Sequence, residues 1–204
     1  MDNFKPGQVL ETNSFVLGSL IEDCGGTYSR HNMLMDDSTK IKQVVQKTAA
    51  EDYQMILILG GSSAGSEDFA KRVILDLGQV FVHGVTIMPG KPVILGDIQG
   101  KPFFVIPGYP VSAIIAFEQF VQPLIYALLG QPEPVKETID VQPTKKIASK
   151  LGVEEFVRVK LGEVDGRIVA TPLARGAGTI TSITEADGII RIPAHVEGLS
   201  DRQP

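Results

Sequence analysis

The stretch that decides the fold is ILILGGSSAGSEDF, residues 56–69, in which a buried apolar strand opens into a loop of small residues and then a helix. Its three glycines let a ligand approach the backbone, and its three serines offer hydroxyl groups. The helix directs unpaired N–H groups and the positive end of its dipole at the loop. The junction predicts a phosphate or oxyanion site, although the same composition also suits a plain turn in an α/β sheet.

Helix-like and strand-like patterns alternate on both sides of this stretch, from residue 13 to residue 130. Apolar residues spaced by three and four predict helices, and short apolar runs between turn residues predict strands. This order predicts helices packed over a sheet, with ligands beyond the carboxyl ends of the strands. One expected helix is capped by Asn13 or Ser14, and the others begin at residues 36–38, at Asp68 and at Val111. The expected strands cover residues 28–35, 56–59, 80–85, 92–95 and 103–106, with the strand at 80–85 buried and a turn at Gln99-Gly100 between the last two strands.

A proline-rich link, Gln131-Pro132-Glu133-Pro134, interrupts the alternation. Two prolines in four residues neither continue a helix nor join a central strand. Beyond the link the pattern is β, with strands at 156–161 and 167–170 around a hairpin turn at Asp165-Gly166. The expected organisation is an α/β domain over residues 1–130, a linker over 131–134 and a β-rich domain over 135–204.

Composition narrows the classes of partner. The formal net charge of −5 over 204 residues argues against electrostatic binding of nucleic acid, which needs clustered Lys and Arg. One cysteine, Cys24, excludes an intrachain disulfide framework and fits a reducing compartment. The N-terminus has no apolar segment behind its charges, and we expect no apolar run that approaches the ~20 residues of a membrane span. We therefore expect a soluble, cytoplasmic protein without a membrane or nucleic-acid partner.

Two further loops are expected at the same edge of the sheet as the glycine-serine loop. The second is Met88-Pro89-Gly90-Lys91-Pro92, whose Lys91 can neutralise a phosphate. The third is Pro107-Gly108-Tyr109-Pro110 followed by Val111-Ser112, in which Pro110 can start a helix and leave its early amides for a ligand. Each loop alone could be structural. The three together predict a binding site.

Two carboxylates add a candidate cation site. Asp68 begins the helix after the glycine loop, and Asp36 follows an expected strand. Both could lie near the same edge and share a divalent cation with phosphate. Asp36 could equally be the N-cap of the next helix, as could Asp37. The three histidines have no metal-ligand spacing.

These loops, in this order, resemble the MoeA family of molybdenum cofactor biosynthesis, the molybdopterin molybdenumtransferases that include the E domain of gephyrin. The resemblance covers nearly the whole chain. Upstream, it includes Pro6-Gly7-Gln8 and Thr12-Asn13-Ser14. Downstream, it includes residues 155–158, the Gly176-Ala177-Gly178 turn and Ala186-Asp187-Gly188.

The resemblance implies a three-layer molybdopterin-binding α/β domain followed by a small β-barrel-like domain. It also implies an enzyme that inserts molybdenum from molybdate into adenylated molybdopterin, with Mg²⁺ assistance and release of AMP, and that acts as a homodimer in the cytoplasm. The implied catalytic residues are Asp36, Asp68, Lys91 and Arg158, of which the two aspartates would also hold the metal. The implied binding residues for the pterin nucleotide are Gly60, Gly61, Ser62, Ser63, Gly65, Ser66, Pro89, Gly90, Pro107, Gly108, Pro110 and Ser112.

Five positions depart from the family pattern, and several of them lack a polar donor. Ser66 replaces an aspartate, Gly84 and Met88 replace basic residues, Tyr109 replaces an asparagine, and Ala177 replaces a serine. The losses favour a second interpretation, a pterin- or nucleotide-binding module without catalysis. A molybdopterin adenylyltransferase is a third, which the β-rich region disfavours. Family members also carry two further N-terminal domains, so we expect this chain alone to be inactive in insertion.

Overall fold

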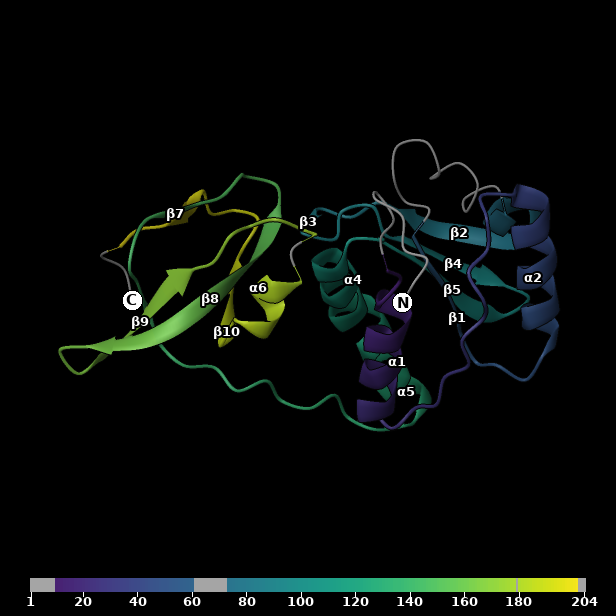
Figure 1. Cartoon of the computed structure of the whole chain (residues 1–204), viewed down its shortest axis with the longest axis horizontal. Coiled ribbons are helices and arrows are strands. Elements are labelled where there is room, and N and C mark those ends of the chain that lie inside the picture. The colour runs from purple at the N-terminus through teal and green to yellow at the C-terminus, as the bar shows by residue number, and fades with distance from the viewer. Residues whose placement is uncertain (1–9, 61–72, 179, 202–204) are drawn as a thin grey trace, which may run out of the picture.

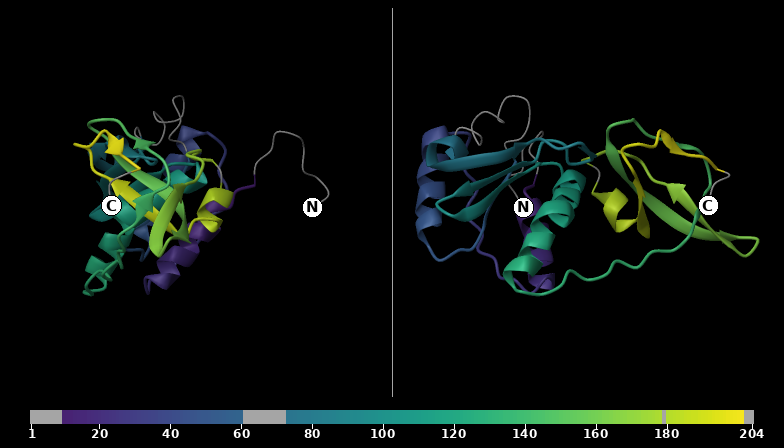
Figure 2. Two further views of the ribbon diagram at one scale, coloured as in Figure 1. Left: turned by 90° about the vertical axis from the view of Figure 1, so that its left-hand side faces the viewer. Right: turned by 180° about the vertical axis from the view of Figure 1, so that it is seen from behind.

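The structure, a computed structural model, describes residues 10–60, 73–178 and 180–201. It has two lobes side by side, an α/β lobe and a β-rich lobe, joined below by residues 131–141, which contain no helix or strand (Figures 1 and 2). The expected α/β fold followed by a β domain is confirmed.

A four-stranded sheet forms the centre of the α/β lobe, in the order β1-β5-β4-β2. Strand β1 is parallel to β5, and β4 is antiparallel to both β5 and β2. Strands β1, β2 and β5 therefore end at one edge of the sheet, where β4 begins. The strand bounds are Ile56–Leu59 for β1, Gly78–His83 for β2, Ile94–Ile98 for β4 and Lys101–Ile106 for β5.

Helices cover both faces of this sheet and give it three layers (Figure 1). Along β5, Phe104 and Ile106 are buried against one helical layer, and Phe103 and Val105 against the other. This alternation places two apolar cores on opposite faces of one strand. The first layer contains α1 (Asn13–Asp23) and a continuous run of α4 (Pro110–Ala116), η1 (Phe117–Val121) and α5 (Gln122–Leu128); the second contains α2 (Ser38–Ala50) and helical residues 73–77.

The β-rich lobe is built around the long hairpin of β8 and β9 (Figure 1). Its turn has Asp165 at φ 51° and Gly166 at φ 74°, the left-handed pair that a tight hairpin requires. Valines of β8 and Ile192 of β10 form its apolar core. The elements are β6 (Gln142–Pro143), β7 (Ile147–Ala148), β8 (Glu154–Val164), β9 (Arg167–Pro172), α6 (Thr181–Thr184), β10 (Gly188–Ile192) and β11 (Gly198–Leu199).

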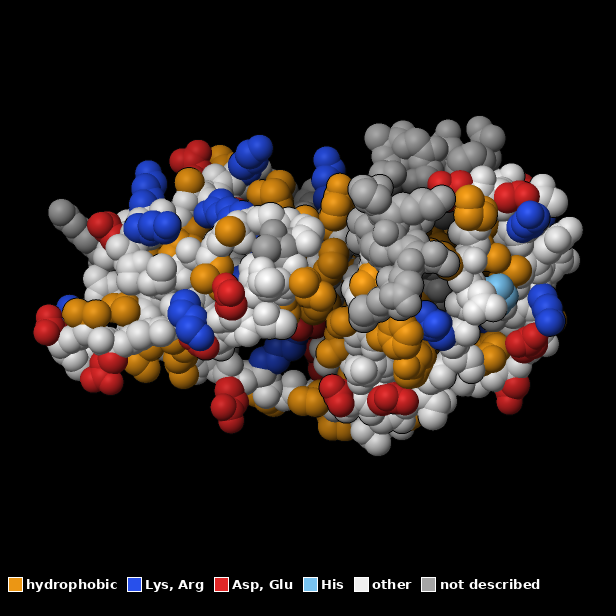
Figure 3. Space-filling view, viewed as in Figure 1, with side chains coloured by type: hydrophobic (Ala, Val, Ile, Leu, Met, Phe, Trp, Pro, Cys, Tyr) orange, Lys and Arg blue, Asp and Glu red, His pale blue; other side chains and the backbone are white. Residues whose placement is uncertain are grey.

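One strand of the α/β lobe crosses into the other sheet. Strand β3 (Ile87–Met88) pairs in parallel with the start of β8. An interlobe cluster of Ile87, Val111, Ile115 and Phe156 packs beside it. Apolar side chains gather along this boundary on the surface as well (Figure 3). The two lobes therefore share buried contacts.

Three expectations about elements were wrong. Residues 28–35 form no strand, and Met33 and Met35 are each 81% exposed, so the apolar end of this segment is not packed against the sheet. Strand β2 lies at the sheet's edge with Phe81 62% exposed, rather than buried. The 19 residues of Pro110–Leu128 are apolar and long enough for a membrane span by length and composition, but half of the run is buried as a core helix.

Candidate functional site

The glycine loop and the proline-glycine loop touch at the edge where β1 and β5 end. The amide of Gly60 donates a 2.9 Å hydrogen bond to the carbonyl oxygen of Ile106. A Cβ on Gly108 would lie 3.4 Å from the Cα of Gly60, so these two backbones are close. Gly60 has φ +85°, which favours glycine. The edge of the sheet therefore brings the backbones of Gly60 and Gly108 close together, with no side chain on either residue.

The lysine loop reaches the same edge by a different route from the expected one. It follows β3, which belongs to the other sheet, and arrives because antiparallel β4 begins there. Gly90 has φ +116°, and a Cβ on it would lie 2.9 Å from Ile87 and 3.7 Å from the carbonyl oxygen of Ser112. The loop therefore packs on the first turn of α4. Lys91 is exposed, with its side chain available to a ligand.

Asn13 anchors the third loop from the start of α1. Its Nδ2 donates a 2.7 Å hydrogen bond to the carbonyl oxygen of Gly108. The helix itself has Thr12 at its N-cap without a side-chain bond, and the Glu11 carboxylate accepts from Ser14 instead. The prediction that Asn13 or Ser14 caps this helix was therefore wrong. The contact between Asn13 and Gly108 was not predicted from the sequence.

Of the two predicted carboxylates, the structure describes one. Asp36 is exposed just before α2, and its neighbour Asp37 is the N-cap, accepting from the amides of Thr39 and Lys40. Because α2 ends close to where β1 begins, its N-terminus points toward the binding edge. Within the described ranges no three acidic, histidine or cysteine side chains cluster as a metal site. Asp68, Gly61, Ser62, Ser63, Gly65 and Ser66 lie outside the described residues.

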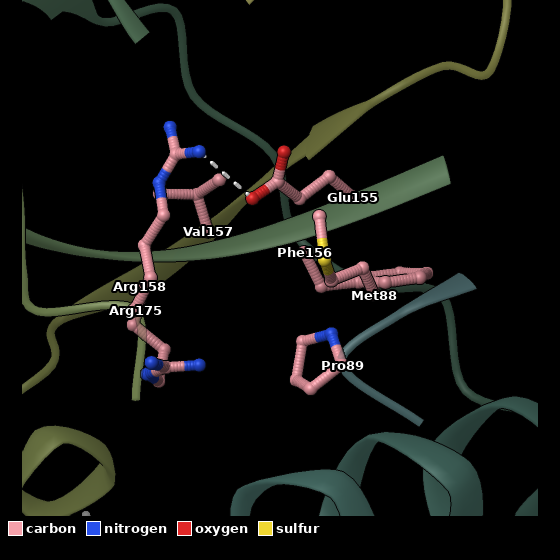
Figure 4. A pocket seen from close by; sticks show the side chains of 7 residues that line it. All are labelled: Met88, Pro89, Glu155, Phe156, Val157, Arg158 and Arg175. Atoms are coloured by element: carbon pink, nitrogen blue, oxygen red, sulfur yellow. Dashed lines mark ion pairs between the residues drawn. The ribbon is translucent and has the colours of Figure 1, made fainter. Parts of the chain in front are cut away.

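A pocket of about 90 Å³ lies between the lobes, along one edge of β8. On that edge β3 pairs with Glu154 and Glu155, and β9 pairs from Val159 onward. The pocket occupies the interval between these two partners. Two arginines lie on one side of it and Met88 and Pro89 on the other (Figure 4). It is lined by Met88, Pro89, Glu155, Phe156, Val157, Arg158 and Arg175.

Arg158 lies buried in this pocket, 4% exposed. Its Nη2 donates hydrogen bonds of 2.8 Å to the carbonyl oxygen of Ala174 and 3.4 Å to that of Gly176. Its Nε is buried and has no partner among the described residues. Burial lowers the pKa of the guanidinium below its ordinary value, because the charged form loses hydration. One N–H of Arg158 is therefore available to an anion.

Glu155 and Arg175 complete the charge of the pocket, and sequence reasoning missed both. Arg175 Nη1 lies 3.1 Å from Glu155 Oε1, the pair drawn as a dashed line in Figure 4. Glu155 is 3% exposed, and its Oε2 has no partner in the described part of the chain. The available signal was the charge at Glu155 and Arg158 on either side of the apolar pair Phe156-Val157. Two cations and one anion leave the pocket positive.

The replaced donor positions also meet at this boundary. Met88 lines the pocket, and the amide of Val111 donates a 3.1 Å hydrogen bond to the carbonyl oxygen of Ala177. A Cβ on Gly178 would lie 3.4 Å from the ring of Tyr109. One early amide of α4 thus binds the other lobe, so the expectation that these amides are left for a ligand was wrong at Val111.

Together, the glycine-lined sheet edge and the positive interlobe pocket define an α/β protein with two features that suit anions. Comparisons with known proteins give its family. Residues 2–127 match the model described as "Probable molybdopterin binding domain", and residues 140–201 match the "MoeA C-terminal region (domain IV)". The chain therefore belongs to the MoeA family, of which it carries the molybdopterin-binding domain and domain IV.

Individual relatives agree with this membership. The chain is 36% identical over 193 residues to a protein of Methanocaldococcus jannaschii named for molybdopterin biosynthesis, covering 94% of this chain and 45% of that protein. It is 29% identical to molybdopterin molybdenumtransferase 2 of Mycobacterium tuberculosis, covering 94% and 48%. A crystal structure of the MoeA protein of Pyrococcus horikoshii superposes with a TM-score of 0.80 at 35% identity, covering 98% and 48%. The chain spans about half the length of these relatives.

Proposed function

We propose that this chain acts in molybdenum cofactor biosynthesis, where it binds adenylated molybdopterin for the insertion of molybdenum from molybdate and the release of AMP. The phosphate end would lie at the sheet edge formed by Gly60, Gly90 and Gly108. The interlobe pocket with Arg158 would receive the oxyanion. The observation that carries the proposal is the contact between Gly60 and Gly108, because it leaves two backbones without side chains at the binding edge.

Mg²⁺ would be held at the same edge by Asp36 together with Asp68. Carboxylate oxygens suit this hard cation, and Asp36 is exposed and has no capping role. The metal would screen the charge of the phosphates. Lys91 would add a mobile cation, and Ser112, whose backbone carbonyl lies beside Gly90, would line the same edge. A homodimer in the cytoplasm, without nucleic-acid or membrane partners, belongs to the same proposal.

Calorimetry with adenylated molybdopterin and with AMP, each with and without Mg²⁺, tests the proposal. We expect binding that strengthens with Mg²⁺ and weakens in Asp36→Asn. Asp52→Asn is the matched control, since Asp52 is exposed between α2 and β1, at the opposite edge of the sheet. Equal Mg²⁺ dependence of binding in the two variants would show that Asp36 does not hold the metal. Absence of binding by a folded protein that includes the family's further domains would overturn the proposal.

A pterin- or nucleotide-binding module without catalysis is the second candidate. Met88 favours it, because an uncharged side chain lines the pocket at a position where the family resemblance implies a basic residue. Loss of one preorganised donor from an enzyme site typically costs about 10²–10³ in rate. An assay of this chain with adenylated molybdopterin, molybdate and Mg²⁺, read by AMP release and by reconstitution of an apo-molybdoenzyme, separates the candidates. We expect binding without useful turnover.

A further inference from the structure

Tyr109 places an aromatic ring at the candidate phosphate edge. The residue is 64% exposed, and it directly follows Gly108, whose backbone lies against Gly60. It stands at the N-cap position of α4, but its side chain makes no capping hydrogen bond. The ring is therefore open to a ligand at the point where the glycine-lined backbones meet.

The backbone that carries this ring is held on both sides. Pro110 begins α4 directly after Tyr109, and the carbonyl oxygen of Tyr109 accepts a 2.9 Å hydrogen bond from the amide of Ala113. On the other side, Asn13 holds the carbonyl oxygen of Gly108 at 2.7 Å. A tyrosine has only two side-chain torsions to fix, so a ligand that covers the ring costs little conformational entropy.

One side of the ring lies against the β-rich lobe. A Cβ on Gly178 would lie 3.4 Å from Cδ1 and 3.8 Å from Cε1 of Tyr109. The same turn accepts a 3.4 Å hydrogen bond from Arg158 Nη2 at the carbonyl oxygen of Gly176. Tyr109 therefore lies between the glycine edge at Gly108 and the turn that Arg158 holds. A ligand that extends from the edge toward the interlobe pocket would pass this ring.

An aromatic ring recognises a different part of a ligand from the amides and hydroxyls around it. Stacking of a heteroaromatic ring on an aromatic side chain raises affinity by about tenfold or more, and it tolerates different rings because each has a π face. A phosphate group has no such face. The asparagine that the family resemblance implies at position 109 would offer hydrogen bonds but no ring to stack on.

We propose that Tyr109 is a stacking platform for a flat heteroaromatic ring of the bound nucleotide, and that it makes this edge selective for phosphates that carry such a ring. Adenylated molybdopterin offers two such rings, adenine and the pterin, which share this stacking chemistry. The inference rests on the proposed binding of that ligand at the sheet edge. Tyr109 acts as a specificity-determining residue, and no covalent bond is formed or broken.

Calorimetry of the unmodified protein and of Tyr109→Leu with three phosphate ligands tests the inference. AMP and molybdopterin each bring one ring, and ribose 5-phosphate brings none. We expect Tyr109→Leu to bind AMP, molybdopterin or both about tenfold more weakly and to bind ribose 5-phosphate as before. The ligand whose affinity falls identifies the stacked ring. Unchanged affinity for both ring-bearing ligands, or an equal loss for ribose 5-phosphate, would overturn the inference.

Two further variants separate stacking from packing and from the hydroxyl group. Tyr109→Phe keeps the ring and should bind all three ligands like the unmodified protein, whereas a loss of ring preference in this variant would contradict stacking. Phe81→Leu is the matched control, since Phe81 is 62% exposed on β2, the strand farthest from β1 in the sheet. It should change none of the three affinities.

Nuclear magnetic resonance gives a readout that a merely structural role would not move. The ring-proton signals of Tyr109, identified as those absent from Tyr109→Leu, should shift upfield with the stacked ligand and stay in place with ribose 5-phosphate. Phosphate binding without any ring preference would reject the role of Tyr109 and leave the proposed function standing. Absence of binding by all three ligands to the folded protein would reject both.

Discussion

The side-chain amide of Asn13 donates a 2.7 Å hydrogen bond to the carbonyl oxygen of Gly108, across 95 positions of sequence. The contact ties the first turn of α1 to the loop that precedes α4. Gly108 in turn lies against Gly60. Asn13 therefore fixes one of the two backbones that form the candidate phosphate edge, although it is far from that edge in sequence.

Asn13→Ala should weaken both the fold and the binding of the pterin nucleotide. Removal of one neutral hydrogen bond lowers the free energy of unfolding by about 0.5–1.5 kcal/mol. Affinity should fall as well, because the Gly108 loop is then less constrained. Denaturant unfolding and calorimetry measure the two effects. Asn32→Ala is the control, as Asn32 is exposed in the irregular segment before α2 and should leave both values unchanged.

Much of the fold could be predicted because its signals are local. Short apolar runs in the sequence predicted β1 and β5, and turns that contain glycine predicted where two pairs of strands reverse direction. Gln99-Gly100 between β4 and β5 and Asp165-Gly166 between β8 and β9 have the positive φ angles that such turns need. Each signal lies within a few residues, so no knowledge of distant contacts was required.

The remaining features depend on contacts between distant residues. Strand β3 exists because residues 87–88 find an edge of β8 more than sixty positions later, and a two-residue strand has no periodicity to detect. The ion pair between Arg175 and Glu155 likewise depends on the pairing of β9 with β8, because Arg175 follows the end of β9 and Glu155 lies near the start of β8. Arg158 could be named in advance through a family resemblance, but its bonds to Ala174 and Gly176 could not.

The two adjacent aspartates before α2 should respond differently to substitution. Asp37→Ala removes the side chain that accepts from the amides of Thr39 and Lys40, and should lower the free energy of unfolding by about 1 kcal/mol. Asp36→Ala should leave stability nearly unchanged and instead reduce the Mg²⁺ dependence of nucleotide binding. Thermal unfolding of both variants is the measurement. A large loss of stability in Asp36→Ala would contradict this prediction and show that Asp36 has a structural role.

Glu118 should make the protein less stable as pH rises. Burial in η1 raises the pKa of its carboxyl above the ordinary value, and the charge of Lys136 opposes this shift more weakly. An acid with a raised pKa in the folded state stabilises the fold while protonated, and this contribution is lost as pH rises from the unfolded pKa through the folded one. Glu118→Gln should therefore be more stable than the unmodified protein at neutral pH.

The difference between Glu118→Gln and the unmodified protein should shrink on acidification toward the ordinary pKa of a glutamate. Urea unfolding across this pH range measures it. Glu137→Gln serves as the control, because Glu137 is exposed in the segment between the lobes and should change neither the stability nor its pH dependence. A pH profile of Glu118→Gln parallel to that of the unmodified protein would show that Glu118 ionises normally.

Met88→Lys should strengthen the binding of oxyanions that carry no proton. Met88 lines the interlobe pocket opposite the two arginines, so an ammonium group there adds a third cation around the anion. A charge-assisted hydrogen bond of ~1.5–3 kcal/mol corresponds to a gain of about tenfold or more in affinity for molybdate or sulfate. Because the added interaction is electrostatic, the gain should decrease at high salt. Met35→Lys carries the same change of charge at a position 81% exposed outside the pocket, and it should leave affinity unchanged. Equal gains in both variants would mean that net charge, rather than a cation placed in the pocket, controls the binding of the anion.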